Sequence, residues 1–228
     1  MVLHVISVGG SLIVPSSIDT LFLKKFSQLI ISRIKKGDRF ILVAGGGKIA
    51  RTYQEAANNI IEIDDEEKDW LGIHSTRLNA HLLRTIFKKH AHYKVIKDYE
   101  KDIEGLDFKE EILIGAGWKP GWSTDYVATL LAQKFNAKSI LNLSNVDFVY
   151  DKDPNKYADA KKFEKISWAE FKILVGEKWD PGMSAPFDPI ATKKSAELNL
   201  KVTIMSGKNL ENLNSFFEGK EFSGTEIS

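Results

Sequence analysis

Residues 2–11 read VLHVISVGGS and residues 39–48 read RFILVAGGGK, and the class of fold follows from these two segments. Each begins with a short apolar run rich in β-branched residues, which is typical of a strand buried on both faces of a sheet. Each run ends in a glycine turn and is followed by a helical pattern of apolar residues, at 17–36 and 48–58. The order strand, turn, helix predicts βαβ units and therefore a parallel sheet.

The alternation of strands and helices continues along the chain. We expect further helices at 70–91, 124–135, 167–176 and 190–198, and further strands at 93–96, 111–114, 138–143 and 201–205, ahead of a last helix. Residues 147–162 would form a connector, and a loop broken by glycine and proline would precede residue 190. The pattern predicts an α/β fold, a three-layer α/β/α sandwich with a mainly parallel central sheet, built as a single domain over residues 1–228.

The composition excludes several classes of protein. With 228 residues, 43% of them hydrophobic, the chain can bury a substantial core. A net charge of +1 gives no strong field to attract nucleic acid or an acidic membrane, so any anion must be bound locally. The lack of cysteine excludes disulfides, thiolate zinc sites and thiol nucleophiles. We recognise neither an export signal nor an apolar run of membrane-spanning length, and we expect a cytoplasmic protein.

Glycine turns follow three of the expected strands: Gly9-Gly10-Ser11, Gly45-Gly46-Gly47 and Gly115-Ala116-Gly117. Ligands of an open parallel sheet gather beyond the carboxyl ends of its strands, where free backbone N–H groups point outward and glycine lets a phosphate approach. A tight turn between a strand and a helix would by itself explain any one of these glycine groups. Three such turns at one edge favour a ligand that carries several phosphates.

Two phosphate-binding motifs can be tested against the second turn. A Walker loop is excluded, because Leu42 stands where its first glycine is required and Ile49 stands where Ser or Thr is required. Residues 45–50 do match the dinucleotide pattern GxGxxA, and residues 60–64 could be the strand that ends in its acidic residue. The position of the pattern argues against a dinucleotide-binding oxidoreductase, because the pattern normally follows the first strand of a domain and here it follows the second.

Polar residues near these turns suit a nucleotide. Arg51 lies four residues after Gly47, close enough to grip a phosphate at the same helix N-terminus. A second group follows the strand at 138–143 and offers groups for a base, a ribose or a metal-bound phosphate: Asn145, Asp147, Tyr150 and Asp153. A solvated arginine and an ordinary polar loop are the alternative interpretations.

The order and spacing of these motifs resemble the amino-acid kinase superfamily, and within it the archaeal-type uridylate kinases. The resemblance covers nearly the whole chain. Besides the first two glycine turns and Arg51, it rests on Asp69 with Gly72, Ser123-Thr124-Asp125, Asn145-Val146-Asp147 with Val149-Tyr150, Asp153-Pro154, Asp188-Pro189 with Lys193, and Gly224-Thr225 with Ile227. The resemblance implies transfer of the γ-phosphoryl group of ATP to UMP, giving UDP and ADP, with Mg²⁺ bound through the phosphates and with no metal site of protein ligands.

The resemblance also implies a site, residue by residue. The ATP-binding residues would be Gly10, Ser11, Gly47, Arg51, Ser144, Asn145, Tyr150 and Asp153. The UMP-binding residues would be Gly46, Asp69, Gly117, Trp118, Lys119, Gly121, Ser123 and Thr124, with the Asp69 carboxylate on the ribose. Acceptor and nucleotide regions would be lobes of one domain, about 1–135 and about 136–228. Phosphoryl transfer needs little covalent chemistry from a protein, so it suffices to hold two phosphates in line and offset their charge.

The chain departs from the family pattern at the position that supplies a cation. Many members of the superfamily carry a lysine two residues before the first glycine, and this chain has Ser7 there. The positive charge must then come from elsewhere. The candidates for a catalytic cation are Lys48, Arg51 and Lys193.

Other replacements bear on specificity. Phe148 stands where the family usually has glycine in the nucleotide-side loop, and Trp118 and Trp122 are bulky enough to reshape the acceptor pocket. Another phosphotransferase of the family and a non-catalytic nucleotide- or oxyanion-binding protein of the same fold therefore stay open as alternatives. The resemblance also implies a homo-oligomer, a hexamer built from dimers. The apolar face of the helix at 17–36 could serve a dimer interface or the core.

Overall fold

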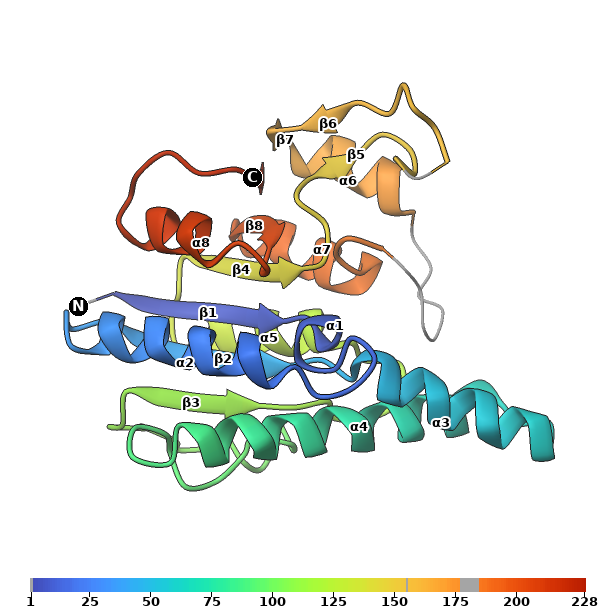
Figure 1. The fold of residues 1–228 in the computed structure, drawn as a ribbon, viewed down its shortest axis with the longest axis horizontal. Helices are drawn as coiled ribbons and strands as arrows, with labels where there is room; N and C mark the ends of the chain where they lie inside the picture. Colours follow the sequence, from blue (N-terminus) through green and yellow to red (C-terminus); the bar gives the residue numbers. More distant parts are fainter. Residues whose placement is uncertain (1, 155, 177–184) are drawn as a thin grey trace.

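The computed structural model describes residues 2–154, 156–176 and 185–228. Its centre is a seven-stranded sheet in the order β3-β2-β1-β4-β8-β9-β7 (Figure 1). These strands are β1 (Leu3–Val8), β2 (Arg39–Ala44), β3 (Ile112–Gly115), β4 (Ser139–Ser144), β7 (Lys165–Ile166), β8 (Lys201–Ser206) and β9 (Thr225–Ile227). The five strands from β3 to β8 are parallel, whereas β9 is antiparallel to β8. A separate antiparallel hairpin consists of β5 (Val149–Tyr150) and β6 (Lys162–Phe163).

Helices cover both faces of the sheet (Figure 1). One face packs against α2 (Thr20–Ile34), α4 (Asp65–Ile86) and α8 (Leu210–Phe217), and the other against α5 (Thr124–Lys134), α6 (Trp168–Val175) and α7 (Pro189–Glu197). Alternate residues of β1 serve the two layers, since Val5 is buried with side chains of α5 and Ile6 with side chains of α2. The three-layer α/β/α sandwich expected from the sequence is confirmed.

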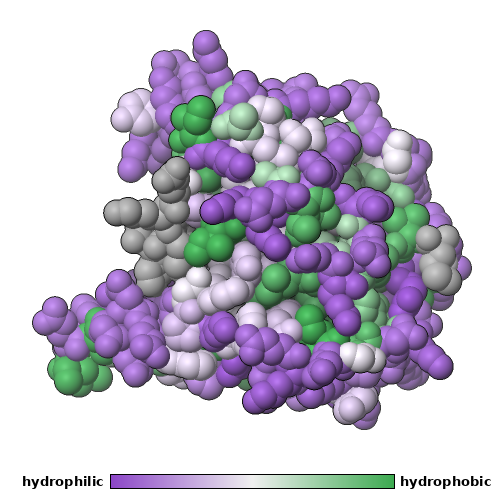
Figure 2. All heavy atoms as spheres, turned by 180° about the vertical axis from the view of Figure 1, so that it is seen from behind, coloured by the Kyte–Doolittle hydropathy of each residue, from purple (hydrophilic) through white to green (hydrophobic). Residues whose placement is uncertain are grey.

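Two helices lie at the edge where the parallel strands end. α1 (Gly10–Ile13) is a single turn that follows β1, and α3 (Gly47–Ile60) follows β2. α3 projects beyond the rest of the molecule (Figure 1), and Ala50 is the one residue of this helix that is buried. Ile60 and Ile61 at its far end are 85% and 67% exposed, and hydrophobic atoms are visible at the tip of the projection in Figure 2.

Capping residues set where the helices begin. Asp19 accepts a hydrogen bond from Phe22 N at the start of α2, whose apolar face is buried in the core. Asp64 accepts one from Glu67 N, so α4 begins at residue 65 and not at the expected residue 70. The acidic residues before position 70 thus form the first turn of α4, where negative charge is favourable.

Several strand predictions need correction. Residues 60–64 are not a strand, because α3 ends at Ile60 and α4 begins at Asp65, so the dinucleotide-binding pattern lacks the strand it requires. Residues 93–96 do not form a strand either, and Ala91 and Ile96 make isolated bridges to β3. The predicted connector at 147–162 contains β5 and the first residue of β6. No pattern in the sequence predicts β7 or β9, because both strands are too short for periodicity to show.

Part of the loop expected before residue 190 falls on residues 177–184 and lies outside the described residues. Within the described part of the chain, none of the helices combines the length and the apolar character needed to cross a membrane.

Candidate functional site

A cleft of about 350 Å³ opens at the edge where β2, β1 and β4 end. Six of the predicted ATP-binding residues line it, namely Gly10, Ser11, Gly47, Arg51, Ser144 and Asn145. Three of the predicted UMP-binding residues, Gly46, Ser123 and Thr124, line it as well. The carboxyl ends of the parallel strands therefore bring residues of both predicted sets into one cavity, as is typical of open α/β sheets.

The first two glycine turns touch each other in this cleft. A Cβ atom on Gly10 would lie 2.7 Å from the carbonyl carbon of Gly45, and one on Gly45 would lie 2.5 Å from Gly10 N. Gly47 also has a φ of +71°, a conformation that favours glycine. Ser11 and Gly47 lie in the first turns of α1 and α3, where backbone N–H groups have no intrahelical acceptor. Amides from two turns can thus bind an anion in one small cavity.

The third glycine turn, residues 115–117, is held differently. Gly117 N donates a hydrogen bond of 2.7 Å to Thr76 Oγ1 on α4. Ala116 is fully buried, and its N–H donates a hydrogen bond of 2.9 Å to Ile96 O. These amides already donate hydrogen bonds within the protein. We expected three glycine turns to bind phosphate, but within the described part of the chain only the first two have amides free to do so.

Side chains of α4 hold the loop between β3 and α5. Arg77 donates hydrogen bonds to the carbonyl oxygens of Gly117, at 3.2 Å, and of Trp118, at 2.8 Å. Asp69 accepts one of 2.6 Å from Gly121 N. Burial raises the pKa of Asp69 above its usual value, and the hydrogen bond from Gly121 opposes that rise. Four of the predicted UMP-binding residues are therefore tied together by one helix, although they lie outside the lining of the cleft.

The same helix also reaches the second glycine turn. Asn79 is buried, and its Nδ2 donates hydrogen bonds to Gly45 O at 2.8 Å and to Gly46 O at 3.1 Å. No motif predicts a role for Asn79, Thr76 or Arg77, since a polar residue within a helix carries no signal of the loop that it will contact. α4 thus couples the second glycine turn to the predicted acceptor loop.

Aromatic side chains crowd this acceptor loop. The rings of Trp118 and Trp122 pack with their centroids 5.1 Å apart, and Trp122 packs on Tyr126 with centroids 4.3 Å apart. The ammonium group of Lys119 lies 4.1 Å from the centroid of the Trp118 ring, at a distance suited to a cation–π contact. The two tryptophans therefore pack on each other, beside the cleft and not in its lining.

Two carboxylates lie on the floor of the cleft, and the first is Asp125. Ser7 Oγ donates a hydrogen bond of 2.9 Å to Asp125 Oδ1, and Asn142 Nδ2 donates one of 3.3 Å to the same oxygen. At the position where the family resemblance led us to look for a lysine, Ser7 gives Asp125 a hydroxyl and no positive charge. Burial and the nearby Asp188 carboxylate raise the pKa of Asp125 to about 7.

The second carboxylate, Asp188, caps α7. Its Oδ1 accepts hydrogen bonds from Ile190 N and Ala191 N, and its Oδ2 accepts one from Ser123 Oγ. Burial raises the pKa of Asp188, and these hydrogen bonds oppose the rise. Within the described part of the chain, neither Asp188 nor Asp125 forms an ion pair with a lysine or arginine. Both belong to motifs that carried the family resemblance, but no role was predicted for either.

The three candidate cations do not meet. Arg51 lines the cleft from α3, whereas Lys48, at the start of the same helix, is not part of the lining. Lys193 lines a separate cavity of about 640 Å³ next to Lys172 and Pro189. Arg51 is thus the candidate that the fold brings to the cleft.

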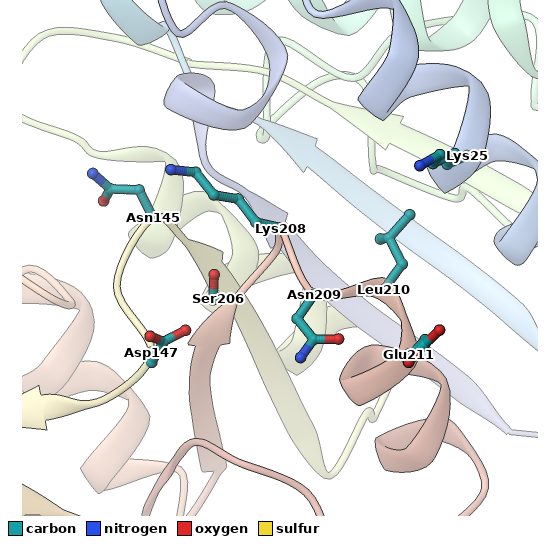
Figure 3. Close-up of a pocket in the computed structure, with 8 residues that line it drawn as sticks. All are labelled: Lys25, Asn145, Asp147, Ser206, Lys208, Asn209, Leu210 and Glu211. Atoms are coloured by element: carbon teal, nitrogen blue, oxygen red, sulfur yellow. The ribbon is translucent and has the colours of Figure 1, made fainter.

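A second pocket, of about 670 Å³, adjoins the cleft at Asn145, which lines both cavities (Figure 3). Its other polar lining comes from α2, from the segments after β4 and β8, and from α8: Lys25, Asp147, Ser206, Lys208, Asn209 and Glu211. The remaining predicted ATP-binding residues, Tyr150 and Asp153, lie on β5 and just beyond it, outside both linings.

The model of the amino acid kinase family matches residues 3–206, a range that includes every residue lining the cleft. The chain therefore belongs to the amino acid kinase family, and the resemblance expected from its motifs is confirmed.

Within that family, the chain is similar to uridylate kinases along almost its whole length. It is 35% identical over 224 residues to the uridylate kinase of Pyrococcus abyssi, covering 98% of both chains. It is 33% identical to that of Thermoplasma volcanium, covering 98% of this chain and 96% of the relative. The crystal structure of uridylate kinase from Archaeoglobus fulgidus superposes with a TM-score of 0.82 at 29% identity, over 100% of both chains.

Proposed function

We propose that the protein is an ATP-dependent phosphotransferase that transfers the γ-phosphoryl group of ATP to UMP, giving UDP and ADP. The observation that carries this proposal is the 35% identity to a uridylate kinase along 98% of both chains. The two glycine turns support it, because they approach each other too closely for a Cβ atom on Gly10 or Gly45, and so bring their backbone amides into one cavity.

In-line phosphoryl transfer requires donor and acceptor phosphates to meet end to end with their charge offset. In our proposal, the turns at Gly10-Ser11 and Gly47 hold the donor phosphates, and Arg51 neutralises charge from α3. Lys48 and Lys193 take second place as catalytic cations, because neither lines the cleft or a pocket that shares a lining residue with it. Ser144, Asn145, Tyr150 and Asp153 would hold the nucleoside part of ATP.

Mg²⁺ fits this cleft as an ion held mainly by the nucleotide phosphates. Such an ion keeps several waters and takes one or two carboxylates in addition to phosphate oxygens. Asp125 and Asp188 offer two carboxylates at the floor of the cleft, and the described residues contain no cluster of three or more His, Asp or Glu that could hold a metal. When bound, Mg²⁺ would offset the charge of the transferring phosphoryl group.

The acceptor would lie on the α4 side of the cleft. Asp69 would bind the ribose, and Gly46 and the loop at 117–124 would surround the rest of UMP. The fixation of that loop by α4 supports this assignment, since a preformed loop loses little entropy on binding. The acceptor lobe, about 1–135, would meet the nucleotide lobe, about 136–228, where β1 pairs with β4.

A coupled assay of ADP formation with ATP, Mg²⁺ and each nucleoside monophosphate in turn tests the proposal. We expect turnover with UMP above that with the purine monophosphates, and none with uridine, which lacks the acceptor phosphate. No turnover with any nucleoside monophosphate would contradict the proposed function.

Ser7 favours one alternative, a nucleotide-binding protein of the same fold that no longer transfers phosphate. The reason is that Asp125 lacks a cationic neighbour on β1. Calorimetry that detects binding of ATP without transfer to any acceptor would support this alternative. A gain of turnover on Ser7→Lys would then identify the missing cation as the cause.

We further propose that the chain forms homo-oligomers in the cytoplasm, as its resemblance implies. The projecting helix α3 supports the proposal, because Ile60 and Ile61 expose apolar surface that a second copy could cover. Light scattering of the purified protein tests it, and Ile60→Ser is expected to lower the measured mass. A monomeric wild-type protein would contradict it.

A further inference from the structure

The loop after β8 brings a cation to the donor edge of the cleft that no sequence motif pointed to. Gly207 N donates a hydrogen bond of 2.9 Å to Ser144 O, which ties the end of β8 to the end of β4. A Cβ atom on Gly207 would overlap Cδ1 of Leu12 on α1. This close packing on α1 positions the next residue, Lys208, beside the first glycine turn.

Lys208 shares pocket linings with two residues that line the cleft. With Asn145 it lines the pocket of about 670 Å³, and with Ser11 it lines a smaller pocket of about 230 Å³. Ser11 and Asn145 both line the cleft itself. In Figure 3 the side chain of Lys208 extends from the loop after β8 toward Asn145.

The charge of Lys208 is not used within the described protein. Lys208 is exposed, and it takes part in none of the ion pairs or side-chain hydrogen bonds among the described residues. Lys25 on α2 lines the same two pockets and is likewise unpaired there. Asp147 and Glu211 also line the larger pocket, but neither forms an ion pair with these lysines. Two unpaired ammonium groups beside a phosphate-binding turn favour an anionic ligand.

We propose that Lys208 contacts the phosphate chain of the donor nucleotide and supplies the positive charge that Ser7 does not. The proposal rests on the proposed function, because it names a further donor-binding residue of the same site. Arg51 approaches the cleft from α3, and Lys208 approaches from the loop after β8, so the two cations flank the glycine turns. Lys25, on α2, lines the same two pockets and adds a weaker, longer-range attraction.

The test compares Lys208→Met, which keeps length and removes charge, with Lys208→Arg, which keeps the charge. We expect Lys208→Met to raise the KM for ATP at least about tenfold and to leave the KM for UMP within about twofold, while Lys208→Arg retains most of the ATP affinity. A loss of packing alone would not separate the two substrates in this way. Lys24→Ala, one residue from Lys25 and outside both pocket linings, is the matched control and should behave as wild type.

Wild-type ATP affinity in Lys208→Met, measured on protein with unchanged thermal unfolding, would overturn the inference while turnover by the wild type still supports the proposed function. If the wild type transfers no phosphate, calorimetry with a non-hydrolysable ATP analogue and Mg²⁺ decides the inference separately. A Kd at least about tenfold weaker in Lys208→Met than in wild type would support it, and an unchanged Kd would overturn it.

Discussion

The two sides of the cleft are built in different ways. On the side of α4, the loop at 117–124 is fixed by hydrogen bonds to Thr76, Arg77 and Asp69. On the side of β4 and β8, Asn145 and Lys208 are exposed, and Lys208 has no ion-pair partner among the described residues. One side is therefore preformed by the protein, and the other presents charge that a ligand must order.

This difference has a thermodynamic consequence. A preformed loop loses little conformational entropy on binding, so its contacts serve to select the ligand by shape. Long, exposed lysines lose more freedom when they bind, but they offer charge to any polyphosphate. We therefore expect selectivity to come from the α4 side and the binding of phosphate charge to come from the β8 side.

Gly10→Val should impair the whole phosphate-binding cavity, because Gly10 lies where the two glycine turns touch. A Cβ atom there has no space, so the turns must separate and their amides no longer face one cavity. We expect kcat/KM to fall by at least about 100-fold, on the order of 3 kcal/mol of transition-state stabilisation. Steady-state kinetics measures this loss. Gly72→Ala is the control for stability, since its Cβ would meet only Gln54 Nε2 at 3.5 Å; equal kinetics for Gly10→Val and wild type would show that the contact of the turns is unimportant.

The pH dependence of stability tests the protonation of Asp125, which lines the cleft between its two sides. Asp125 has a raised pKa of about 7, so between pH 5 and pH 7 the folded state holds a proton that the unfolded state has released. Stability should therefore fall as pH rises, by about 2 kcal/mol over that range, and level off above pH 7. Thermal or urea unfolding of wild type and Asp125→Asn at several pH values measures the difference. Parallel pH profiles for the two proteins would show that Asp125 titrates normally.

Arg51→Ala tests how much of the phosphate binding comes from the guanidinium on α3, because the substitution leaves the backbone amides of the glycine turns in place. Arg51 lines the cleft, and a desolvated contact of its guanidinium with phosphate contributes on the order of 1.5 kcal/mol. We expect kcat/KM to fall about tenfold with unchanged thermal unfolding. Unchanged kinetics would mean that Arg51 is an ordinary solvated arginine, and Arg51→Lys distinguishes loss of charge from loss of the bidentate geometry.

Arg77→Ala should have the smallest effect on kinetics, and we expect that effect on the binding of UMP alone. Without its hydrogen bonds to Gly117 O and Trp118 O, the acceptor loop becomes less ordered before it binds UMP. We expect the KM for UMP to rise about fivefold, near 1 kcal/mol, and the KM for ATP to stay constant. A rise in the KM for ATP instead would contradict the division of the cleft into a preformed and an open side.

Much of the fold could be predicted because its signals are local. β2 lies at residues 39–44, where a short apolar run before three glycines predicts a strand. The dinucleotide interpretation failed because Ile60 is the last residue of α3 and Asp64 already caps α4, which leaves no strand between the two helices. β9 was missed because a three-residue strand draws its stability from its partner β8 and not from its own pattern.

The site was predictable where backbone conformation required a residue type, and less so where side chains from distant segments meet. The first two turns need glycine locally and were found. The sequence offers Lys193 and Arg51 equally as catalytic cations, although Lys193 lines another cavity, because the sequence does not show which way a helix faces. Lys208 was missed for the same reason, as a lysine after a strand looks like any surface residue.

The order of strands and helices, the glycine turns that a phosphate needs and the family of the chain all follow from the sequence. Which turns touch, which turn is closed by α4 and which of the candidate cations lines the cleft depend on the three-dimensional fold. Ser7 and Asp125 illustrate the reason, since 118 residues separate two side chains joined by a hydrogen bond of 2.9 Å. Local sequence fixes local conformation, but only the order of strands in the sheet brings such residues together.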